Sequence, residues 1–378
     1  MATVWTRDKD GNEGGIDMDM EKRLDVVVST AIAEKRIVGA ALMVRQDGRV
    51  RYEKAHGLAD REAGRAMTPD AIFRLSSLTK PIVAATVLAL VDAGKIRLSD
   101  PVTDYLPGFH PDVTIHHLLT HTSGLSSETI LRADETAAGA NRWHLGSKEI
   151  MARLAALPLL FAPGTGWSYG PGIDVLAVIA GNLVGGKPED AIRKYVTDPL
   201  RMVDSRFSVT DVGRLAAAYA DGPDGAVLMS DPHSVPNKWG GMTTYDPGRI
   251  LDARAFQAGG GGMAGTGGDF IALLEALRTG GLLKPETVAL AMDNQTAQLT
   301  HAQGPGWQFS YFGAWLDDPA LGGTPAPRGT NRWGGIYGHN WFIDPVNQLS
   351  VLSMSNTGLE GSDGAYVAEV RDAIYAAL

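Results

Sequence analysis

Two side chains near the start of an apolar stretch could together perform nucleophilic chemistry. Ser77 and Lys80 stand three residues apart within SSLTKP, residues 76–81, and that spacing places them on one helical face. A serine hydroxyl is a poor nucleophile until a base within hydrogen-bond reach takes its proton. A partly desolvated lysine amine can be that base. Taken alone, the pair is also explained by a helix cap followed by a solvated lysine.

The stretch that follows is expected to hold this pair on a buried helix. Pro81 falls in the first turn, where its missing N–H has no intrahelical partner, and Gly94 is a suitable end. Apolar residues recur between them at helical spacing: Val83, Val87, Leu90 and Val91. Ser77 would then lie at a helix start, where free N–H groups favour a developing anion.

Composition sets broad limits on what the chain can do. Its 378 residues are 44% hydrophobic and 20% charged, enough for a large core in two domains or one domain with an insertion. A net charge of -9 argues against a nucleic-acid or anionic-membrane partner. The absence of cysteine excludes disulfides and thiolate chemistry. Without a signal-like segment or a long apolar run, we expect a soluble cytoplasmic protein of undetermined oligomeric state.

The order of the expected elements predicts an α+β fold. A helix over residues 20–36 precedes strands 38–44 and 50–57, which Asp47-Gly48 joins as a hairpin. Strands at 341–343 and 349–354 and a helix at 365–378 close the chain, which suggests one antiparallel sheet built from both termini. The middle is mainly helical, with helices at 149–157 and 175–184. We therefore expect an α/β domain of residues 1–73 and 246–378, and an inserted helical domain of residues 74–245.

Two loop tracts are expected to shape a substrate pocket. Residues 202–262 are rich in Gly, Pro, Asp and aromatic residues and show little periodicity, which is typical of a functional loop tract. The second tract covers residues 134–148. The pattern of residues 270–278, which follow the tract at 202–262, predicts a helix. We expect Asp269 to cap this helix and Gly280 to end it.

Three further motifs follow the Ser77-x-x-Lys80 pair in a characteristic order. They are LLTHTSGL at 118–125, FAPGTGWSY ending at Tyr169, and WGGI at 333–336. Together they resemble the serine β-lactamase and penicillin-binding-protein superfamily. More narrowly, the chain is similar to the family VIII carboxylesterases, which have the fold of class C β-lactamases. The resemblance extends over nearly the whole chain.

This resemblance implies a role for each matching residue. Ser77 is the nucleophile, and Lys80 and Tyr169 are its proton-transfer pair. The oxyanion hole is formed by the backbone N–H groups of Ser77 and Ile336. Substrate contacts fall to Trp333, Gly334 and Gly335, where β-lactamases carry Lys-Thr-Gly. Neither a cofactor nor a metal is implied.

Departures from the β-lactamase pattern favour esters as substrates. Trp333 replaces the lysine that would bind a β-lactam carboxylate, and Pro171 replaces the Asn two places after the tyrosine. No Ser-Asp-Asn motif occurs. The expected function is a serine carboxylesterase that hydrolyses short-chain or compact-acyl esters through a Ser77 acyl-enzyme. The alternatives are an acyltransferase, an amidase or β-lactamase-type hydrolase on the same site, and a non-catalytic ligand-binding domain.

Three other motifs have simpler explanations. Ser168 lies in a G-x-S-x-G match, but Pro163-Gly164 stands where a nucleophile elbow needs a strand. Gly260-x-Gly262-x-x-Gly265 lacks the βαβ unit of a dinucleotide site and is interpreted as a tight loop beside the active site. Arg278-Thr279-Gly280 is interpreted as a basic helix end with a glycine cap.

Histidine and tryptophan residues offer additional candidates. His117 and His121 are four residues apart, as zinc ligands can be, but no HExxH glutamate or third ligand accompanies them. His121 is interpreted as a histidine at a helix end, while His339 could touch the pocket or be structural. Three loop tryptophans could line an acyl pocket or pack in the core: Trp143, Trp167 and Trp239.

Overall fold

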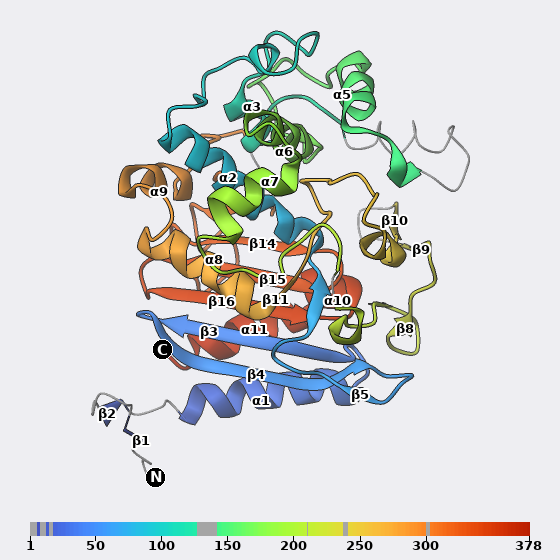
Figure 1. The fold of residues 1–378 in the computed structure, drawn as a ribbon. Coiled ribbons are helices and arrows are strands. Elements are labelled where there is room, and N and C mark those ends of the chain that lie inside the picture. The colour runs from blue at the N-terminus through green and yellow to red at the C-terminus, as the bar shows by residue number, and fades with distance from the viewer. Residues whose placement is uncertain are drawn as a thin grey trace.

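The computed structural model describes residues 6–7, 13–14, 18–126, 142–209, 211–236, 241–299 and 303–378. Its central feature is an eight-stranded antiparallel sheet in the order β12-β13-β14-β15-β16-β3-β4-β5 (Figure 1). Strand β16 pairs with β3, with Ser355 opposite Ala40, so the two ends of the chain share one sheet. The predicted α+β fold with a sheet built from both termini is confirmed.

The strands of this sheet come from two stretches of the chain. The first supplies β3 Gly39–Gln46, β4 Arg49–Asp60 and β5 Arg65–Ala66. The second supplies β12 Trp307–Phe309, β13 Ala314–Leu316, β14 Asn331–Gly335, β15 His339–Asp344 and β16 Leu349–Ser355. The predicted Asp47-Gly48 turn joins β3 to β4, with φ of 51° and 75° at the two residues. Both values are those that a two-residue hairpin of type I′ requires.

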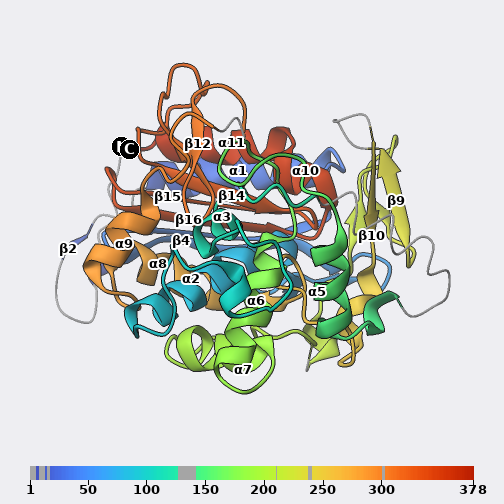
Figure 2. The same ribbon diagram turned by 90° about the horizontal axis from the view of Figure 1, so that it is seen from above.

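Helices cover both faces of the sheet. Helices α1 Met18–Ala33 and α11 Ala365–Tyr375 pack together on one face, and α8 Gly267–Thr279 lies on the other (Figures 1 and 2). Helix α10 Gly358–Asp363 precedes α11, and α9 Pro285–Met292 follows α8. The predicted cap of α8 is wrong, because Thr266 caps it by accepting from the Asp269 N–H. The Asp269 carboxylate instead accepts from Ser205 Oγ, while Gly280 ends the helix in a left-handed conformation as predicted.

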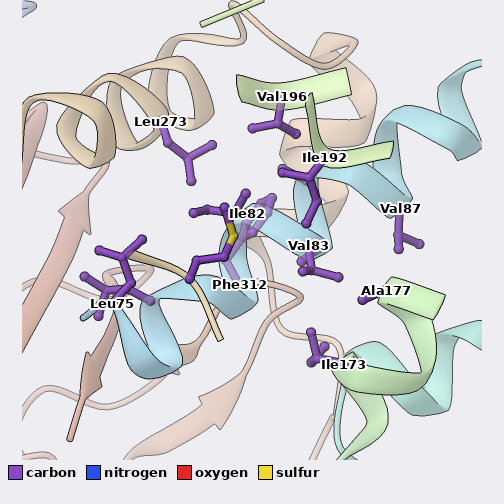
Figure 3. Close-up of a cluster of buried hydrophobic side chains, with 14 of the residues drawn as sticks. Leu75, Ile82, Val83, Val87, Ile173, Ala177, Ile192, Val196, Leu273 and Phe312 are labelled. Carbon is purple, nitrogen blue, oxygen red and sulfur yellow. The ribbon is translucent and has the colours of Figure 1, made fainter. Parts of the chain in front are cut away.

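The centre of the main hydrophobic core is the helix that carries the predicted nucleophile. Helix α2 Thr79–Asp92 continues directly from the 3₁₀ turn η1 Ser76–Leu78, and most of its residues are buried. Figure 3 shows Ile82, Val83 and Val87 of α2 surrounded by apolar side chains from α6, α8 and the segment at 192–196. Because α2 is buried along its length, its first turn is held in place from all sides.

Shorter helices surround α2 on the side away from the sheet. They are η2 Val102–Asp104, α3 Ile115–Leu119, η3 Arg142–His144, α5 Ser147–Ala156, α6 Gly172–Leu183, α7 Pro188–Ile192 and the π-helical η4 Arg193–Thr197. Helices α3 and α7 contact α6, and α6 contacts α2 (Figure 1). This group matches the predicted helical middle. The division into residues 74–245 against the rest stays a prediction.

The loop tract at 202–262 is irregular, as expected, and contains several short helices and strands. These are η5 Val212–Arg214, β7 Tyr219–Ala220, β8 Val227–Leu228, β9 His233–Pro236, β10 Met242–Tyr245 and η6 Pro247–Leu251. Strand β11 Ala264–Thr266 pairs with β6 Ile72–Arg74, directly ahead of the nucleophile turn. A last pair, β1 Thr6–Arg7 with β2 Glu13–Gly14, lies near the N-terminus. In the described part of the chain, no helix has the length and apolarity needed to cross a bilayer.

Candidate active site

Three polar side chains from two distant segments meet at the start of α2. Tyr169 Oη donates a hydrogen bond to Ser77 Oγ at 2.9 Å, and Lys80 Nζ donates to the same oxygen at 3.3 Å. Lys80 Nζ also lies 4.5 Å from the centre of the Tyr169 ring. The predicted convergence of hydroxyl, amine and phenol is therefore present. Loss of a proton from either the phenol or the amine would reverse its bond and let it take the proton of Ser77.

The backbone of Ser76 is strained beside the nucleophile. Ser76 has φ of 43°, a left-handed conformation that is uncommon for a residue other than glycine. Its side chain is buried, and Gly335 of β14 lies against it so closely that a Cβ there would come 2.5 Å from Ser76 Oγ. Such strain is tolerated where the surroundings fix the conformation, and it is concentrated at functional sites.

A peptide of the glycine-rich loop holds the amine of Lys80. Lys80 Nζ donates to Gly260 O at 2.5 Å, and the N–H of Gly260 donates to Asp174 Oδ1 at 2.9 Å. Protein surrounds most of the Asp174 side chain, and the resulting desolvation raises the pKa of its carboxyl. The rest of its surface remains exposed. The loop therefore lies beside the site, as predicted, and it connects Lys80 to a carboxyl of α6.

The phenol of Tyr169 has a donor of its own on the sheet. Trp333 Nε1 donates to Tyr169 Oη at 3.1 Å, and the two rings lie 5.2 Å apart. Trp333 stands where the resemblance places a lysine, so a neutral N–H takes the position of a cation. Hydrogen bonds to the charged form of an acid favour that form. This contact therefore places an N–H donor on the oxygen that would exchange a proton with Ser77.

Other aromatic rings enclose Tyr169. The centre of the His121 ring lies 4.7 Å from that of Tyr169. Trp167 stacks on Tyr169, and Phe309 packs against His121 and Trp333. His121 is buried at the end of α3 with φ of 59°, and its Nδ1 accepts a bond from Gly170 N–H at 3.4 Å. Burial, with a smaller contribution from Lys80, lowers the pKa of His121 to about 3. His121 is thus a neutral ring that supports Tyr169.

A pocket of about 400 Å³ opens over this site. One part of its wall is mostly apolar, from the segment 143–157, which also contributes Arg153, together with Ile250, Phe256 and Met263. Ile336, the second predicted oxyanion residue, also lines it, and Tyr245 Oη fixes that residue by donating to its carbonyl at 3.1 Å. Trp143 lines the pocket, which agrees with the first of the two roles predicted for it, pocket wall or core packing. The predicted pocket wall from the loop tract is also present, because residues 244–262 contribute much of it.

Several other candidates have structural surroundings. His339 is buried and bonds Arg74 O through Nε2 at 2.8 Å, and burial lowers its pKa to about 4. His117 shares a capping box with Thr114 at the start of α3. Ser168 lies in a stretch without helix or strand, so it lacks the strand of a nucleophile elbow. Trp239 and most of the predicted loop at 134–148 lie outside the described residues.

The glycines after Trp333 are needed for close packing. A Cβ on Gly334 would come 2.9 Å from His339 O, and one on Gly335 would meet Ser76 Oγ and Leu75 O. They let β14 approach the nucleophile turn, and their predicted substrate contacts stay a prediction. Among the described residues there is no group of three His, Cys, Asp or Glu that could hold a metal ion.

Some pocket residues were missed by sequence reasoning. Asp174, Arg74 and Arg249 all line the pocket, yet none belongs to a recognised motif. Asp174 had one usable signal, because an acid in the first turn of a helix five residues after Tyr169 must lie near that tyrosine. Arg249 had none, since its position depends on the path of an irregular loop.

Comparison with known proteins places this geometry in a family. The model of the family described as "Beta-lactamase" matches residues 24–376. The chain belongs to the Beta-lactamase family. It is 42% identical to Esterase EstB of Burkholderia gladioli over 371 residues, which cover 94% of this chain and 95% of EstB.

Solved structures agree with this assignment. EstCE1, described as a hydrolase with promiscuous acyltransferase activity, superimposes with a TM-score of 0.90 at 36% identity. The match covers 95% of this chain and 99% of EstCE1. Unliganded simvastatin synthase (LovD) from Aspergillus terreus is 22% identical with a TM-score of 0.73, covering 95% and 98% of the two chains, and shows the fold alone. The predicted resemblance to family VIII carboxylesterases is confirmed.

Proposed function

We propose that this protein is a serine carboxylesterase that works through an acyl-enzyme on Ser77. The single observation that carries the proposal is the shared hydrogen bonding of Ser77 Oγ with Tyr169 Oη and Lys80 Nζ. Likeness to Esterase EstB over 94% of the chain supports hydrolysis of carboxylic esters. Within this proposal the partner is a small ester, without nucleic acid or membrane, and the protein works in the cytoplasm.

The proposed reaction has two halves. Ser77 Oγ attacks the ester carbonyl while its proton passes to Tyr169 or Lys80, and the carbonyl oxygen becomes an oxyanion between the N–H groups of Ser77 and Ile336. The same proton then goes to the departing alcohol as the C–O bond breaks. In the second half, water gives a proton to the same pair and attacks the acyl carbon. The pair returns that proton to Ser77 Oγ as its bond to the acyl carbon breaks, so the acid is released and the free serine is restored. Each oxyanion donor is worth roughly 3 kcal/mol in comparable enzymes.

The contacts around the pair support a division of labour. The N–H of Trp333 favours a charged phenol at Tyr169, and Gly260 O fixes the position of the Lys80 amine. Both groups are partly buried beside Ser77, and the lower local dielectric strengthens the electrostatic interactions within the site. The intact arrangement argues against a non-catalytic domain, because a ligand-binding site would not need a strained nucleophile turn.

The pocket accommodates more than a small acyl group. A volume of about 400 Å³ falls in the range of pockets that enclose a drug-sized ligand. We therefore extend the expected compact-acyl preference to esters with a larger acyl or alcohol part. The description of EstCE1 as a hydrolase with acyltransferase activity supports a second candidate, transfer of the acyl group to an alcohol. Product analysis with a competing alcohol separates the two.

Replacing the nucleophile tests the proposal directly. We expect Ser77→Ala to lower turnover of p-nitrophenyl butyrate by roughly 10⁴-fold or more, as nucleophile removal does in serine hydrolases. The matched control is Ser168→Ala, which alters the rival serine and should leave turnover near that of the parent protein. Substantial turnover in Ser77→Ala, with the fold shown intact by circular dichroism, would refute the proposal.

A further inference from the structure

The wall of the pocket carries an unusual charge balance. The chain has a net charge of -9, yet the pocket is lined by four cationic side chains and two acidic ones. The cations are Arg74, Lys80, Arg153 and Arg249, and the acids are Asp174 and Asp246. A cleft of one sign within low-dielectric walls attracts ligands of the opposite sign. Arg153 is paired with Glu149 at 2.7 Å, so Arg74, Lys80 and Arg249 remain against Asp174 and Asp246. The pocket wall thus has one more cation than acid in an otherwise acidic protein.

Arg249 is the cation whose surroundings are most informative. Its guanidinium lies over the Trp143 ring, 4.8 Å from the ring centre, and its Nη2 donates to Phe256 O. Its Nε is buried without a partner, and among the described residues no carboxylate lies within ion-pair distance of it. Burial lowers the pKa of Arg249, and the acid that opposes this shift most is Asp174.

One partly buried acid lies near two partly buried cations. Asp174 feels both Lys80 and Arg249, and it accepts a hydrogen bond from Gly260 rather than from either cation. Arg74 nearby donates to carbonyls, at 2.8 Å to Pro247 O and 2.7 Å to Ala216 O, and the acid that acts on its charge is Asp231 outside the pocket wall. A buried charge without a counter-charge is costly. A ligand that brought a negative charge would relieve that cost.

The glycine-rich loop places Arg249 close to the reacting group. Gly260 O binds Lys80, and a Cβ on the next residue, Gly261, would lie 3.6 Å from the Ser76 backbone. A Cβ on Gly262 would lie 2.8 Å from Arg249 Nη1. Gly260, which binds Lys80, and Gly262, which lies against Arg249, are only two residues apart in the loop. Because consecutive α-carbons are about 3.8 Å apart, the two cations lie close together. A substrate bound at Ser77 lies within reach of both.

We propose that Arg249 binds a carboxylate carried by the substrate, so that the preferred esters are anionic. The inference rests on the proposed function and narrows its substrate class to esters with a carboxylate a few bonds from the scissile carbonyl. Half-esters of dicarboxylic acids carry that charge on the acyl side, and acetyl esters of hydroxy acids carry it on the alcohol side. Arginine suits this role because its planar fork matches a carboxylate.

The test compares esters that differ in charge but share an acyl chain. Rates of hydrolysis are measured by pH-stat at low ionic strength for monoethyl and diethyl glutarate, and for acetyl glycolate and its methyl ester. We expect the anionic member of at least one pair to have a kcat/KM at least tenfold higher. The preference should shrink as salt is added, because salt screens the attraction. The pair that shows it identifies the side of the ester that carries the charge.

Variants separate recognition from a structural role. Arg249→Gln should reduce the anionic-to-neutral ratio at least tenfold, and Arg249→Lys should reduce it less. The control Arg328→Gln removes the same charge from an exposed residue outside the pocket and should keep the ratio. If Arg249→Gln lowers kcat/KM equally for both esters of a pair, the arginine only holds Phe256 and Trp143 in place, and the inference is wrong. A parent ratio near one for both pairs overturns it as well.

A binding measurement keeps the inference testable if the variants do not fold or no ester is hydrolysed. Calorimetry on the Ser77→Ala protein should detect saturable binding of glutarate and none of 1,5-pentanediol. Absence of glutarate binding would overturn the inference, whatever the hydrolysis assays show. Glutarate binding without hydrolysis of any ester by the parent protein would instead refute the proposed function and leave the anion site standing.

Discussion

The hydrogen bond from Trp333 to Tyr169 offers a sharp perturbation, because phenylalanine lacks the indole N–H but keeps an aromatic ring at the same position. Trp333→Phe eliminates the N–H that lies 3.1 Å from Tyr169 Oη. It keeps an aromatic ring against Tyr169 and Phe309, which lie 5.2 Å and 5.4 Å from Trp333 between ring centres. The fold should tolerate the change, whereas the phenol loses its donor on the sheet.

The size of the effect depends on the charge of the phenol during reaction. A hydrogen bond between neutral groups is worth about 1 kcal/mol, and one to a charged group about 1.5–3 kcal/mol. If Tyr169 carries negative charge in the transition state, kcat should therefore fall roughly 10- to 100-fold. If the phenol stays neutral throughout, the loss should be only about fivefold.

The assay is turnover of p-nitrophenyl butyrate across pH, with a matched tryptophan as the control. Trp341 is the cross-strand partner of Trp333, and its buried Nε1 has no hydrogen-bond partner in the described structure. Trp341→Phe should therefore leave kcat near that of the parent protein. A Trp333→Phe protein with turnover within twofold of the parent, alongside an inactive Tyr169→Phe protein, would show that the indole N–H plays no part.

Two further predictions concern stability. Burial holds the pKa of His121 at about 3 and that of His339 at about 4, below the ordinary value of 6.5, so the unfolded chain binds protons that the folded chain does not. The free energy of unfolding should fall from about pH 6.5 to about pH 4, by up to ~1.4 kcal/mol per pH unit for each histidine. Urea unfolding measures this, and an unchanged slope in His339→Gln would contradict it. Gly335→Ala would push a Cβ to 2.5 Å from Ser76 Oγ, so it should cost about 1–3 kcal/mol and lower kcat. In Gly146→Ala the added Cβ meets nothing within 4 Å, so the variant should lose less Tm even though Gly146 is the N-cap of α5. Equal Tm values for the two variants would contradict the packing argument.

The parts of the fold with strong local signals could be predicted from the sequence. Periodicity located α1, α8 and α11, and the Asp47-Gly48 pair located the hairpin of β3 and β4. Strands β12 and β13 were missed because each has three residues, too few to show an alternation. The cap of α8 was misplaced because both Thr266 and Asp269 are good capping residues, and tertiary contacts with Ser205 engaged the second.

The candidate site could likewise be predicted only in part from the sequence. Ser77, Lys80 and Tyr169 belong to ordered motifs, so their meeting could be expected. The bond from Trp333 to Tyr169 depends on the path of β14, which sequence spacing does not determine. The charge balance around Arg249 depends on which loop residues face inward, and an irregular segment has no period from which that could be inferred.

Covalent labelling tests the central claim most directly. The protein is treated with an organophosphonate that reacts with activated serines, digested, and analysed by mass spectrometry. We expect a single modification, on the peptide that contains Ser77, and no labelling in Tyr169→Phe under the same conditions. Modification of Ser168 instead, or equal labelling of the parent protein and Tyr169→Phe, would contradict the proposed activation of Ser77.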